Sequence, residues 1–154
     1  MSSQVLSKQA TEAWVSLVRS YSTLVGELNG QLVSAHGLTI NDYEVLLRLA
    51  QAPERRMRRV DLAESVLLTA SGITRLLDRL ERDGYVERAE CASDRRVTYA
   101  VLTEDGYDKL REAADTHMSG VQELFAGRYS VAELERLAEL LGRVAGGDDL
   151  ECTP

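Results

Sequence analysis

Cysteine and histidine are scarce in this chain, with two of each among 154 residues. Cys91 and Cys152 lie far apart in the sequence, and His36 and His117 complete no metal-ligand spacing. A disulfide framework needs more cysteines, and a metal centre needs a closer cluster of ligands. We therefore expect neither, and no cofactor is predicted.

Long apolar runs are also absent. No stretch approaches the ~20 apolar residues of a membrane-spanning helix, and Met1 to Ala10 is too polar for a secretory signal. No Ser-His-Asp, Cys-His or glycine-rich phosphate-binding arrangement is present, so an enzyme is not expected. With 44% apolar and 28% charged residues, the composition is that of a folded soluble protein. These features predict one cytoplasmic domain with no membrane partner.

Basic residues are outnumbered in the whole chain, whose formal net charge is −7. Between Arg48 and Arg96, however, eleven arginines and nine carboxylates leave a local charge of +2, with no lysine in the segment. An acidic protein with arginine concentrated in one segment can bind DNA there, while the acidic remainder limits non-specific association.

Helical spacing dominates the segment from Thr69 to Gly84. Its apolar residues recur at i, i+3, i+4 and i+7, and these are Ile73, Leu76, Leu77 and Leu80. Thr69 is the predicted N-cap, and Gly84 is the predicted end of the helix. A short helix is predicted over residues 60–66, and a tight turn joins it to this longer helix. The two helices form a predicted helix-turn-helix.

Two β-type runs follow this helix, Tyr85–Glu90 and Val97–Leu102, and a charged turn separates them. They predict a hairpin, or wing, after the helix-turn-helix. A helix with small hydroxyl residues in its first turn fits the DNA major groove, and wing arginines fit an adjacent backbone or minor groove. Taken alone, the helix pattern is equally consistent with DNA binding and with an ordinary solvent-exposed helix and hairpin.

Long amphipathic helices are predicted on both sides of this module. One spans about residues 5–33, a second runs from Thr103 to about Gly127, and a third follows Ser130, which forms a capping box with Glu133. A helix of nearly eight turns cannot bury its apolar stripe within a small domain. We therefore expect part of it to pack on a second copy of the chain.

Between the first long helix and the helix-turn-helix, we predict a helix that Thr39 caps and Pro53 ends. A basic connector is predicted over Glu54–Arg59. Its arginines either contact DNA phosphate or lie in a solvated loop, and their place before the helix-turn-helix favours phosphate. Further along, Arg79, Arg82 and Arg88 alternate with carboxylates, which predicts intramolecular ion pairs there.

Three blocks of the sequence stand out together: L-T-I-N-D-Y-E-V-L-L-R-L at Leu38–Leu49, the run from Asp61 to Arg88, and D-R-R-V-T-Y-A-V-L-T-E-D-G at Asp94–Gly106. In this order and spacing they resemble the MarR family of winged helix-turn-helix transcription regulators. The resemblance implies a mainly α fold with a small β-wing. It also implies a single domain over residues 1–154, with dimerisation helices at 5–35 and 104–146, the winged helix-turn-helix at 38–103 and a tail at 147–154.

The same resemblance implies a homodimer that binds a pseudo-palindromic site in double-stranded DNA, and a repressor that a small aromatic or anionic ligand releases. Thr69 would contact phosphate, and the recognition helix would contact bases or nearby phosphates through Ser71, Gly72, Thr74 and Arg75. Arg96 would enter the minor groove, with Asp94 orienting it and Arg95 beside it.

The effector hypothesis concerns Trp14, Tyr21, Tyr43 and Asp61. They would line a ligand pocket between the dimerisation helices and the winged helix-turn-helix. The alternative is that the aromatic residues pack in the core or dimer seam, which is the commoner role of aromatic residues at helical spacing.

Two other functions are left open. Oxidation of Cys91 in the wing would control DNA binding, although the family's oxidant sensors carry their reactive cysteine near the start of the chain. A winged-helix adaptor would bind protein instead of DNA. Steep salt dependence would distinguish DNA binding from that alternative.

Overall fold

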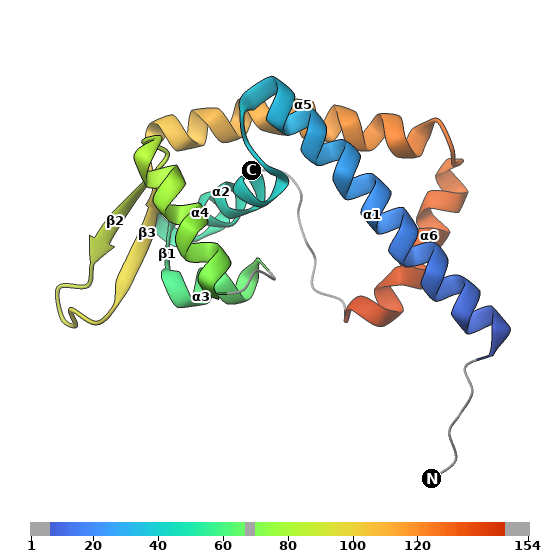
Figure 1. The fold of residues 1–154 in the computed structure, drawn as a ribbon, viewed down its shortest axis with the longest axis horizontal. Helices are drawn as coiled ribbons and strands as arrows, with labels where there is room; N and C mark the ends of the chain where they lie inside the picture. The colour runs from blue at the N-terminus through green and yellow to red at the C-terminus, as the bar shows by residue number, and fades with distance from the viewer. Residues whose placement is uncertain (1–6, 67–69, 147–154) are drawn as a thin grey trace, which may run out of the picture.

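A computed structural model describes residues 7–66 and 70–146 of the chain (Figure 1). Most described residues are helical and the strands form a small antiparallel sheet, so the predicted fold class is confirmed. In chain order the elements are α1 (Lys8–His36), α2 (Ile40–Gln51), η1 (Pro53–Arg55), β1 (Arg56–Arg58), α3 (Arg59–Ser65), α4 (Ala70–Arg82), β2 (Val86–Glu90), β3 (Thr98–Leu102), α5 (Glu104–Ala126) and α6 (Val131–Ala145).

Side-chain caps begin the helices where the sequence predicts them. Thr39 Oγ1 accepts a hydrogen bond from the Asp42 amide at 3.1 Å, and Asp42 Oδ2 accepts one from the Thr39 amide at 2.8 Å. Ser130 and Glu133 form the same reciprocal pair at the start of α6. Thr103 caps α5 through the Gly106 amide at 3.0 Å. Each cap satisfies amides that lack a partner within the helix.

The predicted basic connector over Glu54–Arg59 joins α2 to α3 and contains a turn and a strand that the sequence did not predict. Pro53–Arg55 forms the 3-10 turn η1, Arg56–Arg58 forms β1, and α3 begins at Arg59. β1 pairs antiparallel with β3, Met57 lying opposite Ala100, and the strand order is β1-β3-β2. A three-residue strand with two arginines is too short to show alternation. Its extended form arises from pairing with β3, which follows some forty positions later in the chain.

The apolar face of α4 covers the core. Its four predicted apolar residues are all buried, together with leucines of α2, α3 and α5, and this set includes Ile73, Leu76, Leu77, Leu80, Leu46, Leu49, Leu62 and Leu110. A fully buried leucine stabilises the fold by roughly 2 kcal/mol relative to an exposed one. The core therefore holds α4 against α2, α3, the sheet and the start of α5, with the polar face of α4 outward.

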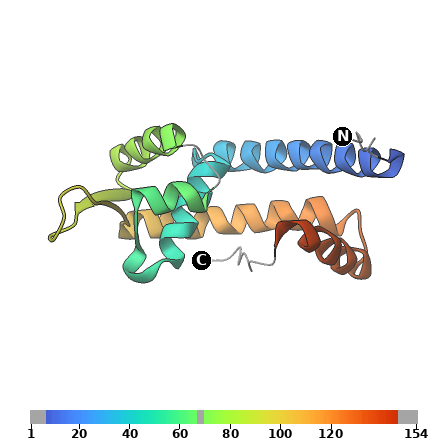
Figure 2. The ribbon, with the colours of Figure 1, turned by 90° about the horizontal axis from the view of Figure 1, so that it is seen from below.

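The long helix α5 joins the wing to α6, and α1 packs against part of its length (Figures 1 and 2). α1 and α5 meet closely at Gly120, where a Cβ would lie 3.0 Å from Leu28 Cδ2. A hydrogen bond of 2.7 Å between His36 Nε2 and Thr116 Oγ1 joins the same two helices.

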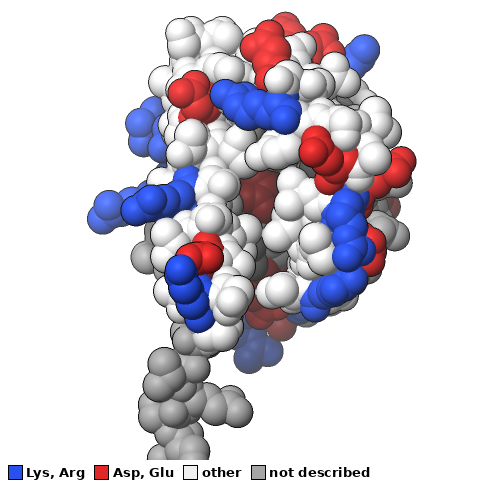
Figure 3. Space-filling model, turned by 90° about the vertical axis from the view of Figure 1, so that its right-hand side faces the viewer, with Lys and Arg blue, Asp and Glu red and all other residues white. Residues whose placement is uncertain are grey.

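Beyond that contact, α1 and α6 diverge. Figure 3 shows them as two lobes separated by a deep hollow. None of the residues of α6, Val131–Ala145, is buried, and the N-terminal half of α1 exposes large apolar side chains. Within residues 7–66 and 70–146, none of the helices is both long and apolar enough to cross a membrane.

Candidate nucleic-acid interface

The predicted recognition helix is α4. Gly72, Thr74 and Arg75 are exposed, with Arg75 on the side opposite the buried apolar residues, and Ser71 belongs to the first turn of the helix. Thr69, the predicted cap and phosphate contact, lies outside the described residues. The helix is followed by Gly84 in the left-handed conformation, with φ of 80°, a backbone geometry that glycine adopts without steric cost. The exposure of Gly72, Thr74 and Arg75 means that the first turns of α4 face solvent, as a groove-binding helix requires.

The wing consists of β2, β3 and the turn between them. Its tip is closed by the Cys91 amide, which donates to the Val97 carbonyl oxygen at 3.1 Å, and by the Val97 amide, which donates to the Asp94 carbonyl oxygen at 3.1 Å. The tip therefore has a defined shape that projects from the body of the protein (Figure 1).

At the wing tip, Asp94 holds Arg96. Asp94 Oδ1 accepts hydrogen bonds from the Arg96 amide at 3.0 Å and from Arg96 Nε at 3.1 Å, and Oδ2 accepts one from the guanidinium at 3.2 Å. These bonds lower the pKa of Asp94. The Arg96 side chain is still 91% exposed. The predicted contact between the two residues is present, with Arg95 exposed beside it.

The arginines before the helix-turn-helix are built into the fold. Arg55 donates to Glu104 Oε1 at 3.0 Å and lies 3.8 Å above the centre of the Tyr107 ring. Arg56 lies 4.1 Å above the centre of the Tyr99 ring. These contacts join β1 and the turn before it to β3 and α5, so a purely solvated loop does not describe this segment.

The next two arginines also pair with carboxylates. Arg58 makes a two-point contact with Asp61, at 2.8 and 3.0 Å. This pairing raises the pKa of Arg58 above its already high ordinary value. Arg59 reaches across to α4, which is the less expected contact of the two.

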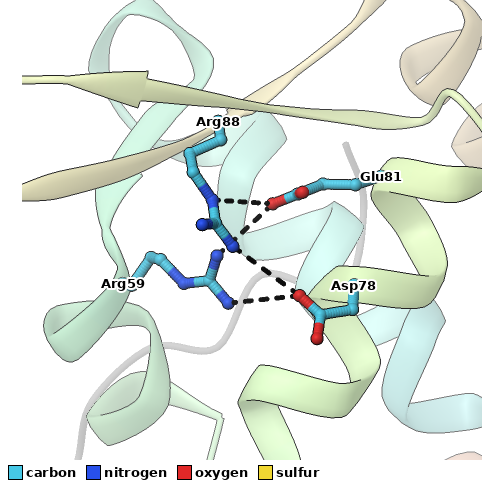
Figure 4. Close-up of polar contacts among 4 residues, drawn as sticks. All are labelled: Arg59, Asp78, Glu81 and Arg88. Atoms are coloured by element: carbon cyan, nitrogen blue, oxygen red, sulfur yellow. Dashed lines mark hydrogen bonds and ion pairs between the residues drawn. The ribbon is translucent and has the colours of Figure 1, made fainter.

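Figure 4 shows that Arg59 of α3 and Arg88 of β2 converge on two carboxylates of α4. Arg59 lies 3.3 Å from Glu81 Oε1 and 4.0 Å from Asp78 Oδ1. Arg88 lies 3.5 Å from Glu81 Oε1 and 3.7 Å from Asp78 Oδ1. The predicted intramolecular pairing of Arg88 is confirmed, and the partners come from a different element.

Arg79 of α4 pairs with Asp42 of α2. Nothing in the local sequence pattern pointed to a contact between Asp42 and an arginine 37 positions away. Asp42 is 1% exposed. A buried carboxylate is rarely tolerated without a cation or strong donors, and that rule is the one signal that could have suggested a distant arginine.

The four predicted effector residues do not gather in one place within the chain. Trp14 and Tyr21 are 65% and 68% exposed on α1. Tyr43 is buried, and its ring centre lies 4.6 Å from that of His117. Asp61 pairs with Arg58 and borders an open hollow of about 480 Å³ beside β1, whose lining includes none of the three aromatic residues.

Burial lowers the pKa of His117 from its ordinary value of 6.5. The folded state therefore favours the neutral imidazole, and protonation favours unfolding. We expect the free energy of unfolding to be highest above pH 6.5 and to decrease as the pH falls below it and His117 becomes protonated. Thermal unfolding of the wild type and His117→Gln should show a smaller decrease for the variant between pH 7 and pH 5. Equal decreases in both proteins would contradict this assignment.

Cys91 is half-buried at the base of the wing tip, and its Sγ lies 3.2 Å from Ser93 Oγ. The pKa of the Cys91 thiol is lowered by hydrogen bonds, chiefly with the Ser93 side chain and also with the backbone of Ser93 and Asp94. Cys152 lies outside the described residues.

Known proteins are similar to this chain in both sequence and fold. Residues 38–98 match the MarR family. AbsC, a MarR family transcriptional regulator from Streptomyces coelicolor, is 32% identical, with 93% of this chain and 96% of that one covered and a TM-score of 0.82. The chain belongs to the MarR family. Members of this family are transcription regulators and not enzymes, so the expectation of a non-enzyme is confirmed.

Two further relatives bear on function. Sco3205 from Streptomyces coelicolor, solved in complex with DNA, is 30% identical, with 99% of this chain and 95% of that one covered and a TM-score of 0.86. The transcriptional repressor YetL of Bacillus subtilis is 30% identical over 109 residues, covering 71% of this chain and 65% of the repressor.

Proposed function

We propose that this MarR-family regulator is a homodimer that binds a pseudo-palindromic operator and represses transcription until a small aromatic or anionic ligand releases it. The observation that carries DNA binding is the outward polar face of α4 beside a wing tip whose exposed Arg96 is held by Asp94. Sco3205, similar over almost its whole length, is solved with DNA, and YetL is named as a repressor.

In this proposal α4 enters the major groove and the wing enters the flanking minor groove. Ser71, Gly72, Thr74 and Arg75 contact bases or nearby phosphates, and Thr69 contacts phosphate. Arg96 enters the minor groove, oriented by Asp94, and Arg95 contacts the adjacent backbone. Gly72 lets the helix approach the groove closely, because it has no side chain beyond Cα.

Dimerisation is proposed for the helices at 5–35 and 104–146, which flank the winged helix-turn-helix at 38–103. Exposed apolar side chains run along the described part of α1 and recur on α6, namely Trp14, Val15, Leu17, Val18, Tyr21, Leu140, Leu141 and Val144. Exposed apolar side chains gathered on two helices in this way are typical of a protein interface. A second copy would cover it and fill the hollow of Figure 3.

The effector site is proposed at the same seam, between the dimerisation helices and the winged helix-turn-helix. Trp14 and Tyr21 are the candidates whose rings are exposed in a single chain. Tyr43 and Asp61 are already engaged by His117 and Arg58, so a ligand that reached them would displace those contacts.

The test is an anisotropy titration of the purified dimer, its mass confirmed by light scattering, against DNA selected from a random pool and a scrambled control. We expect selective binding that weakens steeply with salt, because bound phosphates release counterions. Arg75→Ala should weaken binding to selected DNA more than binding to scrambled DNA. Arg111→Ala, which replaces an exposed arginine of α5, should leave the affinity for both DNAs unchanged.

Equal loss on both DNAs for Arg75→Ala would remove it from the base contacts. Absence of selective binding by a folded wild-type dimer would favour the protein-binding adaptor. Release by oxidant, abolished by Cys91→Ser, would favour redox control over a ligand. A panel of small aromatic acids added to the bound complex tests the effector class.

A further inference from the structure

We propose that ion pairs on both flanks of α4 set its rotation about its own axis, and that their members are positioning residues for base recognition. This inference rests on the proposed function, in which α4 contacts bases. It concerns the pairs that join α4 to α2 on one flank and to α3 and β2 on the other.

On the first flank, Arg79 donates to Asp42 Oδ1. The other carboxylate oxygen is already held by the Thr39 amide at 2.8 Å, so the acceptor cannot turn away. The start of α2 is itself tied to α1, because the Ile40 amide donates to Asn29 Oδ1 at 3.0 Å. Arg79 is thus anchored to a buried, immobile group that connects α4 with the long helix α1.

On the second flank, Asp78 and Glu81 face two arginines from different elements, as Figure 4 shows. Arg59 belongs to α3, and its side chain is 17% exposed. Arg88 belongs to β2, at the base of the wing. Each arginine reaches both carboxylates within 4.0 Å, so this flank of α4 is joined to α3 and the wing at once.

Helical geometry places Arg79 and Glu81 on opposite sides of α4. At about 100° per residue, they are separated by about 200° around the axis, with Leu77 and Leu80 of the core between them on the inner side. Arg75 and Arg82 fall between them on the outer side, as does Asp78, and all three are exposed. The pairs made by Arg79 and Glu81 therefore border the strip that would face the bases, and Asp78 lies within that strip.

The two kinds of contact constrain α4 differently. Apolar burial is non-directional and tolerates small rotations, whereas hydrogen-bonded ion pairs depend on geometry. A rotation of about 20° moves a side-chain tip at a radius of about 6 Å by about 2 Å. Such a shift breaks a base hydrogen bond, which needs a donor–acceptor distance near 3 Å. The flanking pairs thereby control which base contacts can form.

The test compares two double variants that each remove the ion pairs of one flank: Asp42→Asn with Arg79→Gln, and Arg59→Gln with Arg88→Gln. The control, Arg111→Gln, removes one exposed arginine at the start of α5. The readout is the ratio of Kd for a site with one base pair changed to Kd for the selected site, measured beside circular dichroism. We expect this ratio to fall about tenfold in each flank variant, which is the discrimination that roughly one base contact supplies, and to be unchanged in the control.

A purely structural role would lower the melting temperature, or weaken all DNA equally, and leave the ratio intact. That result, in a wild type that binds selectively, would overturn this inference alone. A wild type without selectivity would overturn the proposed function and the inference with it. If a double variant fails to fold, a single change to lysine on the same flank, Arg79→Lys or Arg88→Lys, keeps the charge, loses the planar guanidinium and gives the same comparison.

Discussion

Replacing Arg96 with alanine is expected to weaken binding of the dimer to its selected DNA by about a hundredfold. A minor-groove arginine contributes about tenfold per wing, and the homodimer loses two of them. The guanidinium is 91% exposed and already oriented by Asp94, so little ordering cost opposes its contribution. Scrambled DNA should lose affinity to a similar extent, because the wing follows groove shape more than base identity.

Salt dependence provides a second reading of the same variant. The slope of log affinity against log salt should become shallower by about two, one unit for each wing. Arg111→Ala, which removes an exposed arginine of α5, should leave affinity and slope unchanged. An Arg96→Ala protein with wild-type affinity would place the wing away from DNA.

Replacing Gly106 with alanine is expected to destabilise the fold by about 3 kcal/mol, near the upper end for an added methyl group in a packed site. An added Cβ would overlap the carbonyl oxygen of Tyr85 and lie 2.9 Å from its carbonyl carbon and 2.8 Å from Leu102 Cδ1. The Tyr85 oxygen accepts a hydrogen bond from the Thr103 amide at 3.1 Å, so the backbone cannot easily move aside.

The measurement for Gly106→Ala is thermal or urea unfolding, and a decrease of about 10 °C in Tm is expected for a domain of this size. Gly142→Ala is the matched control, because no heavy atom lies within 4 Å of its added Cβ. In a helix this change should raise stability by roughly 0.5 to 1 kcal/mol. Similar melting temperatures for Gly106→Ala and the wild type would mean that α5 does not pack against the wing as described.

Features that depend on neighbours a few positions apart were predictable. The caps at Thr39, Thr103 and Ser130 need only a side chain within reach of an amide three residues later. The Asp94–Arg96 contact spans two residues within one turn. The buried face of α4 follows from helical periodicity, because residues three and four apart share a face.

The aromatic residues show where that reasoning stops. Trp14, Tyr21 and Tyr43 all have helical spacing with other apolar residues, yet Tyr43 is buried and the other two are exposed. Periodicity identifies the apolar face of a helix but does not specify what covers it. For α1 that cover is the proposed second copy, which no single chain contains.

The MarR-type order of helices, the wing, the outward face of α4 and the Asp94–Arg96 contact could all be predicted from residue patterns, since each depends on residues a few positions apart. Three features became visible only in the folded chain: Arg56–Arg58 forms a strand, Gly106 needs to be glycine, and Arg79 and Arg59 hold α4 from opposite flanks. Those contacts join residues separated by about 20 to 45 positions, and a charged residue in the sequence does not specify its distant partner. The carboxylate that binds a given arginine is chosen by where the core places the helices.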